Sequence, residues 1–352
     1  MSKFFSSKLK ELEAYVPGEQ PQDKKYVKLN TNESPFPPSP YAERLARQAA
    51  GGLNLYCDPE CRVLTSVAAE RFGVKKENII FTNGSDEVLN FAFLAFCDEK
   101  TPAVFPDVTY GFYPVFAKVN GVPYREIPLT SSMEICVEDY FNAKGTVFIA
   151  NPNAPTGIAL PLSAIESILK NNPQNVVVVD EAYVDFGGES ALALLGKYDN
   201  LLVTRTFSKS CSLAGGRLGI GFASEAIIAD LNKIKYSTNP YNVNSMTAAA
   251  GVGALLDAEY FNANVKTICE NRAYLTEALT GLGFEVLPSS ANFIFAKKQG
   301  VSGEKLYLSL KEKGVLVRYF NKERLKSFVR ITVGTKEQID ALLAATKSVL
   351  EG

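Results

Sequence analysis

Lys209 is the side chain in this sequence whose surroundings best suit covalent chemistry. It follows a predicted strand within the segment TRTFSKSCSLAGGRLGIG, which is rich in small and hydroxyl-bearing residues. A lysine in a tight, partly buried loop can lose its proton and act as nucleophile and base. Arg217 comes later in the same segment, where the next strand begins. This segment alone leaves open the alternative of an ordinary exposed loop lysine.

Asp180 ends the predicted strand VVVVD, so its carboxylate begins next to a dry core. A charge in such a place needs a partner. Tyr183 follows in the same segment, VVVVDEAYVDF. The alternative is an aspartate that only caps the turn after the strand.

Two further turns follow predicted strands. In FTNGSDE, Gly84 precedes a helix that begins at Ser85 or Asp86. Glycine lets backbone N–H groups approach an anion, and a helix N-terminus favours a phosphate, although Ser85 could also be a plain N-cap. In ANPNAPTG, two prolines and a glycine predict a rigid turn, which could hold the Asn153 amide against a ligand.

These four features fall at the carboxyl ends of successive strands, where open α/β sheets place their ligands. Together they match the needs of pyridoxal 5′-phosphate (PLP). Its aldehyde requires a lysine, its pyridine nitrogen a carboxylate, and its phosphate a helix end with cationic support. The sequence therefore predicts a PLP site.

The composition excludes several other kinds of site. The chain has 352 residues and no histidine, so it contains no histidine base, Ser-His-Asp triad or histidine metal ligand. Cys57 and Cys61 are the only close cysteine pair, and nothing completes a zinc site; we expect no metal and reduced thiols. With a net charge of −1, the chain has no electrostatic footprint for nucleic acid.

The sequence also carries no membrane signal. Its first residues, MSKFFSSKLKELEAY, lack the apolar segment of a signal peptide. The most apolar stretch, residues 88–97, is interrupted by Asn90 and is far shorter than the roughly 20 residues that span a bilayer. We expect a cytoplasmic protein.

The elements that must position these residues alternate along the chain. Apolar β-branched runs at 78–82, 146–150, 176–180 and 201–206 alternate with helical patterns at 86–96, 162–169 and 226–235. Strands that are apolar throughout indicate a mostly parallel sheet covered on both faces. We expect this large α/β domain to span residues 45–245.

The ends of the chain differ from this pattern. The first 40 or so residues are rich in proline and predict an extended arm. After Asn244 a long helical pattern runs to about Leu282, followed by short strands and two helices. We expect residues 246–352 to form a smaller α+β domain, to which residues 1–44 contribute an arm and part of the structure.

The chain resembles the histidinol-phosphate aminotransferase family, within the class I/II, fold-type I PLP enzymes that share the aspartate aminotransferase-like fold. The resemblance is carried by segments that keep their order from about Tyr15 to Thr335. These segments are YVPGEQP, KLNTNESPFPPSP, NLYCDPE, TNGSDE, DVTYGFY, NPNAPTG, VVDEAYVDF, TRTFSKSCSLAGGRLG, ANFIFA, GVLVR and FVRITVGT.

The resemblance implies a role for each matching residue. Lys209 would carry the cofactor covalently, Asp180 would pair with the pyridine nitrogen, Tyr183 and Asn153 would reach the ring hydroxyl, and Tyr110 would stack on the ring. The residues around the phosphate would be Ser85, Asp86, Thr206, Ser208 and Arg217, with Gly84 forming the turn. Ala154 stands where the family often has a second asparagine, so Asn151 is the alternative to Asn153.

The remaining implied roles concern the partner subunit and the substrate. Tyr56 would reach the cofactor phosphate of a partner subunit, which implies a homodimer. Tyr15, Asn32, Arg318 and Arg330 would line the substrate side, with Arg330 gripping the anionic group. In FVRITVG, Arg330 alternates with apolar residues and therefore faces either solvent or the cleft.

The resemblance implies an aminotransferase of histidine biosynthesis that moves an amino group between glutamate/2-oxoglutarate and histidinol phosphate. An aromatic aminotransferase and a threonine-phosphate decarboxylase of the same fold are alternatives. A ligand-sensing module of this fold would require a DNA-binding domain, for which the chain has neither room nor basic patch. No G-x-G-x-x-G follows an early strand, which disfavours a dehydrogenase.

Overall fold

The computed structural model describes residues 2–10 and 12–351. Its largest sheet has seven strands, in which β8 pairs antiparallel with both of its neighbours and the remaining four pairings are parallel. In spatial order the strands are β2 (Ile79–Asn83), β8 (Leu218–Ala223), β7 (Leu201–Thr206), β6 (Val177–Asp180), β5 (Thr146–Ala150), β3 (Ala103–Pro106) and β4 (Tyr124–Ile127). The predicted mostly parallel α/β sheet is confirmed.

Both faces of this sheet are buried, as the valines of β6 illustrate. Val177 and Val179 face one apolar core and Val178 faces another. Successive side chains of a strand point to opposite faces, so a strand covered on both sides must be apolar throughout. The first core takes residues from α1 (Pro40–Ala49), α2 (Arg62–Phe72), α5 (Leu162–Lys170) and α7 (Ser245–Leu256), and the second from α3 (Ser85–Phe96), α4 (Tyr113–Asn120) and α6 (Glu225–Thr238).

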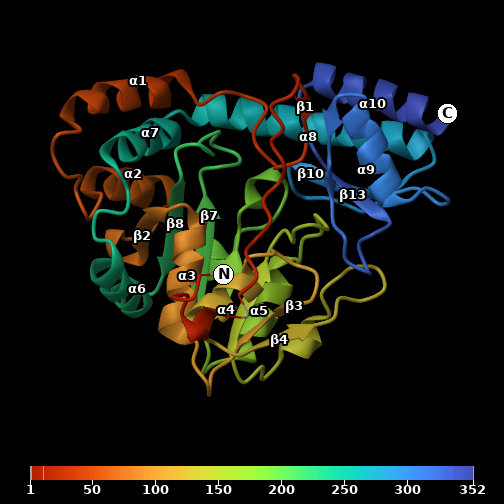
Figure 1. Cartoon of the computed structure of the whole chain (residues 1–352). Helices are drawn as coiled ribbons and strands as arrows, with labels where there is room; N and C mark the ends of the chain where they lie inside the picture. Colours follow the sequence, from red (N-terminus) through yellow and green to blue (C-terminus); the bar gives the residue numbers. More distant parts are fainter. Residues whose placement is uncertain (1, 11, 352) are drawn as a thin grey trace.

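A second unit, blue at the upper right of Figure 1, has its own apolar core. Its antiparallel sheet has the order β12-β13-β10-β9. β1 (Val27–Lys28), from the start of the chain, pairs in parallel with β11. The elements of this unit are α8 (Ala258–Gly281), β9 (Glu285–Val286), β10 (Phe293–Lys297), α9 (Gly303–Glu312), β11 (Val315–Leu316), β12 (Arg318–Tyr319), β13 (Phe328–Thr332) and α10 (Lys336–Glu351).

The expectation of one long helical stretch from about 244 to 282 is wrong, because the chain forms two helices there. Asp257 lies between α7 and α8 with φ −95° and ψ 63°, outside the helical region. Its carboxylate accepts a hydrogen bond from the Tyr260 amide at 3.3 Å and so caps α8. Aspartate favours such caps because its side chain competes for nearby backbone N–H groups.

The break also bears on the division into domains. α7 packs closely against α1, because a Cβ at Gly253 would lie 2.5 Å from Ala42 Cα. Ala250 and Ala254 belong to the core of the large sheet. We therefore propose that the boundary lies at Asp257 rather than after residue 245.

Two further features concern residues 2–10 and 12–351 as a whole. No helix in these ranges is both long and apolar enough to cross a membrane. Nor do these residues contain a cluster of three side chains suited to a metal ion. Cys57 and Cys61 are both free thiols.

Candidate active site

The carboxyl ends of the central strands surround a cavity of about 340 Å³. It brings together most of the side chains that the sequence predicts for the cofactor. The predicted residues that line it are Ser85, Asp86, Tyr110, Asp180, Tyr183, Thr206, Ser208, Lys209 and Arg217.

Lys209 enters this cavity from the loop that joins β7 to β8. Its Nζ lies 3.4 Å from the Thr31 carbonyl oxygen, a long hydrogen bond, and 5.8 Å from the centroid of the Tyr183 ring. The loop is closed by backbone hydrogen bonds such as that from Leu213 N to Phe207 O, at 2.9 Å. The lysine is therefore held mainly by its backbone, and its amino group makes only this long hydrogen bond to Thr31 O among the described residues.

Asp180, the last residue of β6, is 4% exposed. Tyr113 donates a hydrogen bond to its Oδ2 at 3.1 Å, and the Ala182 amide donates to its Oδ1 at 3.3 Å. Burial raises the pKa of Asp180 to about 7; the Tyr113 hydroxyl opposes this, and the charge of Asp86 adds to it. A buried carboxyl of this kind is stabilised in its charged form by a cationic N–H group in the cavity.

A turn and a helix end form an anion cradle at one end of the cavity. Gly84 has φ +80°, which glycine adopts without strain, and α3 begins at Ser85. The strand opposite approaches so closely that a Cβ at Gly219 would lie 2.3 Å from Ser85 N. Arg217 donates to Asp86 Oδ2 at 3.1 Å and to Ser208 Oγ at 3.5 Å. A helix N-terminus with an arginine beside it suits a phosphate.

Tyr110 lines this cavity and also a neighbouring, larger one. Its hydroxyl donates to Asp86 Oδ1 at 2.7 Å. Burial, followed by the charge of Asp86, raises the pKa of Tyr110 well above its ordinary value, so the phenol stays neutral.

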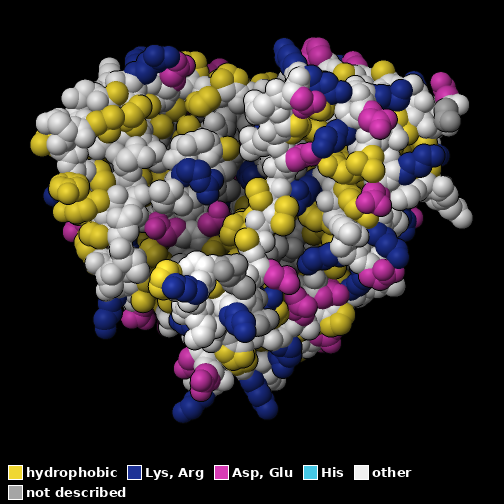
Figure 2. Space-filling model, in the orientation of Figure 1, with side chains coloured by type: hydrophobic (Ala, Val, Ile, Leu, Met, Phe, Trp, Pro, Cys, Tyr) yellow, Lys and Arg dark blue, Asp and Glu magenta, His cyan; other side chains and the backbone are white. Residues whose placement is uncertain are grey.

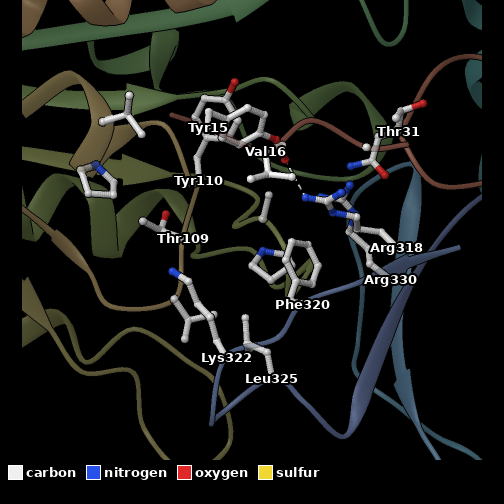
Figure 3. A pocket seen from close by; sticks show the side chains of 18 of the residues that line it. Tyr15, Val16, Thr31, Thr109, Tyr110, Arg318, Phe320, Lys322, Leu325 and Arg330 are labelled. Atoms are coloured by element: carbon white, nitrogen blue, oxygen red, sulfur yellow. Dashed lines mark hydrogen bonds between the residues drawn. The ribbon is translucent and has the colours of Figure 1, made fainter. Parts of the chain in front are cut away.

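The neighbouring cavity, of about 410 Å³, contains the four residues predicted for the substrate, of which Figure 3 labels Tyr15, Arg318 and Arg330. It shares Tyr183 and Lys209 with the first cavity. Arg330 lies between two rings, with its guanidinium carbon 5.3 Å from the centroid of Phe293 and 5.4 Å from that of Phe320. Its Nη2 donates to Asn30 O at 3.2 Å, whereas its buried Nε has no partner within the described chain. Burial lowers the pKa of Arg330. An anion in this cavity would supply the missing partner.

The other three predicted substrate residues are held by neighbouring segments. Arg318 donates to the carbonyls of Pro17 at 3.0 Å and Val16 at 2.8 Å, so it fixes the N-terminal arm. Tyr15, on that arm, stacks on Phe112 with the ring centroids 4.1 Å apart. The Asn32 amide donates to the Tyr183 hydroxyl at 3.0 Å.

Besides Gly84, three predicted residues do not line these cavities. The Asn153 amide donates to Val108 O at 3.0 Å and to Thr156 Oγ1 at 3.1 Å. The Asn151 side chain accepts from Leu160 N at 2.8 Å and donates to Leu160 O at 3.1 Å. Tyr56 is 84% exposed on the outer surface, where it stacks on Tyr241 with the centroids 4.6 Å apart. Their predicted roles remain untested.

Sequence reasoning missed Tyr113, whose hydroxyl reaches Asp180. Tyr113 lies in the aromatic segment TYGFYPVF at the start of α4 and is fully buried. A buried phenol requires a polar partner, but the partner lies far away in the sequence. Only the pairing of β5 with β6 and the packing of α4 reveal it.

The fold and these two cavities define a class of protein. The family model for class I and II aminotransferases matches residues 24–345, and the chain belongs to that family. More narrowly, it is 45% identical to a histidinol-phosphate aminotransferase of Brachyspira hyodysenteriae, with 100% of both chains covered.

Solved structures have the same fold. The histidinol-phosphate aminotransferase of Clostridium acetobutylicum superposes with a TM-score of 0.85 at 26% identity, covering 92% of this chain and 99% of that one. A second histidinol-phosphate aminotransferase, from Sinorhizobium meliloti and in complex with pyridoxal-5′-phosphate, has a TM-score of 0.89 at 24% identity and covers 100% of this chain and 98% of that one. The predicted aspartate aminotransferase-like fold is confirmed.

The cofactor of this family, pyridoxal 5′-phosphate, fits the smaller cavity. Lys209 can reach its aldehyde, the buried Asp180 suits a protonated pyridine nitrogen, and the Gly84–Ser85 turn with Arg217 suits its phosphate. Bound there, PLP withdraws electrons from the bond that breaks at the substrate α-carbon.

Proposed function

We propose that this chain transfers the amino group between histidinol phosphate and 2-oxoglutarate, as an aminotransferase of histidine biosynthesis. The observation that supports this proposal is the pair of adjacent cavities, which share lining residues. One is fitted for PLP, and the other holds the buried Arg330, whose Nε lacks a partner within the described residues. The full-length similarity to histidinol-phosphate aminotransferases favours this substrate over the aromatic and decarboxylase alternatives.

The cofactor-binding roles divide between charge and shape. Asp180 would hold the proton on the ring nitrogen, because its own carboxyl is stabilised when a cation faces it. Tyr183 and Asn153 remain our candidates for the ring hydroxyl, with Asn151 as the alternative, and Tyr110 for stacking. Asn153 would have to exchange its present partners, Val108 O and Thr156 Oγ1, to take that role.

Lys209 would move the proton between the substrate α-carbon and the cofactor carbon. Its Nζ borders both cavities, and the chain has no histidine to take the role. A neutral amine held over the breaking bond suits general acid–base catalysis. The N-terminal arm, fixed by Arg318, lies over this region and would help to exclude water.

Arg330 would bind the anionic group of both substrates in turn. Glutamate presents an α-carboxylate, and histidinol phosphate presents a phosphate ester. The planar fork of a guanidinium binds either one bidentately. The aromatic rings of Phe293 and Phe320, near the guanidinium, would lower the local dielectric and so strengthen the charged contact.

We further propose a cytoplasmic homodimer in which Tyr56 reaches the cofactor phosphate of the partner subunit. Tyr56 lies in an exposed apolar patch with Leu53, Leu55, Val63 and Tyr241, which are between 44% and 71% exposed. Figure 2 shows apolar side chains gathered at the left of the molecule, over α1 and α2. Such patches mark association surfaces, and two-fold dimers are the commonest assembly.

The test is a comparison of amino donors. Purified protein supplied with PLP should turn over histidinol phosphate with 2-oxoglutarate, with a kcat/KM well above those for phenylalanine and tyrosine. Equal or higher kcat/KM for an aromatic amino acid would overturn the substrate assignment. Release of CO₂ from threonine phosphate would instead indicate the decarboxylase.

A further inference from the structure

A buried ionic cluster lies behind the cofactor cavity and has no role in the chemistry described so far. It consists of Glu181, Asp185 and Arg205, whose side chains are 0%, 23% and 14% exposed. Arg205 pairs with Asp185 Oδ1 through Nη2 and lies 3.7 Å from Glu181 Oε2 through Nε. Charges are costly to bury, and apolar side chains of similar size often stabilise a fold equally well. The cluster therefore calls for a reason other than stability.

Its members alternate along the chain with residues of the cofactor cavity. Glu181 follows Asp180, and Arg205 precedes Thr206. The third connection reaches Lys209, because the hydroxyl of the next residue, Ser210, donates to Asp185 Oδ2 at 2.5 Å. The cluster thus ties the ends of β6 and β7 to the lysine loop.

A second cavity borders the lysine loop. It has a volume of about 220 Å³ and is lined by Asp185, Arg205, Ser210 and Cys211 among others. Side chains that border empty space lose the contacts that would otherwise hold them in place. Within the described residues, the only hydrogen bond of the Lys209 amino group is the long one to Thr31 O. A short hydrogen bond to a carboxylate is directional and strong, and can replace the missing packing.

We propose that Asp185 is a positioning residue for Lys209, acting through the Ser210 hydroxyl and itself oriented by Arg205. Asp185 does not touch the reacting atoms. It sets the direction from which the lysine side chain enters the cavity. The lysine's part in the reaction rests on the function proposed above, whereas its placement relative to bound cofactor does not depend on the substrate.

Two serines allow a matched test, because each gives one hydrogen bond to a carboxylate of the cluster. Ser210 donates to Asp185 beside the lysine, whereas Ser190 donates to Glu181 Oε2 at 2.7 Å, away from the lysine loop. We expect Ser210→Ala to lower kcat by about 10- to 100-fold with little change in KM, as small misplacements of a reacting group do. Ser190→Ala should lower the melting temperature about as much as Ser210→Ala does, but it should leave kcat unchanged.

Readouts that need no substrate separate this idea from the proposed function. In Ser210→Ala, and not in Ser190→Ala, the pH midpoint of the visible absorbance of bound PLP should shift and PLP should dissociate faster. Ser210→Thr, which keeps the hydroxyl, should restore both. If both alanine variants kept the wild-type absorbance midpoint and PLP dissociation rate, the cluster would be structural only and the proposal would be wrong. A wild-type protein inactive towards histidinol phosphate would refute only the proposed function.

Asp185→Asn provides a second variant in case Ser210→Ala fails to fold. It keeps an oxygen that can accept from Ser210 and loses the charge that pairs with Arg205. We expect it to shift the absorbance midpoint in the same direction as Ser210→Ala, with a larger loss of kcat. A wild-type midpoint in a folded, PLP-loaded Asp185→Asn protein would overturn the proposal.

Discussion

Replacing Arg330 with lysine tests the substrate site most directly. The change keeps the positive charge and removes the planar fork, including the Nε that has no partner among the described residues. The fork can give an anion two parallel charge-assisted hydrogen bonds, whereas an ammonium group acts as a point charge. Loss of one such bond costs about 1.5–3 kcal/mol, which corresponds to roughly 10- to 100-fold in kcat/KM. Both half-reactions should weaken, because each substrate presents an anion to the same site.

Single-turnover kinetics would measure the two half-reactions separately, one with glutamate and one with histidinol phosphate. Arg272→Lys is the matched control: Arg272 is a partly buried arginine that donates to Phe186 O at 2.8 Å and Ala291 O at 2.7 Å and lines neither cavity. It should lower the melting temperature and leave kcat/KM for both donors unchanged. If Arg330→Lys left both half-reactions unchanged, Arg330 would not be the anion anchor and the substrate assignment would lose its main support.

Other variants test the cofactor site, the assembly and the pH response. Borohydride reduction followed by peptide mapping should place the PLP label on Lys209, and a label elsewhere would refute its role. Asp180→Asn should keep PLP and lose about 10²–10³-fold in kcat, and a near-normal kcat would argue against its charge. Burial raises the pKa of Asp180 from 3.8 to about 7, so between these pH values the folded protein without PLP retains a proton that the unfolded chain has lost. Its free energy of unfolding should therefore fall as the pH rises from 3.8 to about 7. Thermal melts should show a smaller fall for Asp180→Asn. Mixed dimers of Tyr56→Ala and Lys209→Ala subunits should regain activity. If they regained no activity despite verified subunit exchange, Tyr56 would act within its own chain.

The large sheet could be predicted well from the sequence, because the composition of its strands indicates that both of its faces are buried. The run at 176–180 is apolar at every position before Asp180, as expected for a strand of a sheet that is covered on both faces, and the observed β6 differs from it by one residue at its start. The strands at 146–150 and 201–206 agree fully with β5 and β7. The break at Asp257 was missed because the residues on both sides of it continue a helical pattern.

The site was predictable wherever a motif fixes the backbone, and less so where side-chain direction decides. The turn at Gly84 and the helix start at Ser85 follow from local chemistry. The direction of the Asn153 amide depends instead on how its turn folds, and Ala150 and Ala154 face the cavity. The cluster around Asp185 was not predicted, because Arg205 and Ser210 meet it only after β6 and β7 have paired.

The pairing of β1 with β11 has a consequence for when the two cavities form during folding. Val27 and Lys28 leave the ribosome early and pair with Val315 and Leu316, near the other end of the chain. Contacts between such distant segments form late in folding. The cofactor cavity depends on this segment too, because Thr31, shortly after β1, lines it and its carbonyl oxygen accepts from Lys209 Nζ. Both cavities are therefore complete only after the last strands of the chain have folded.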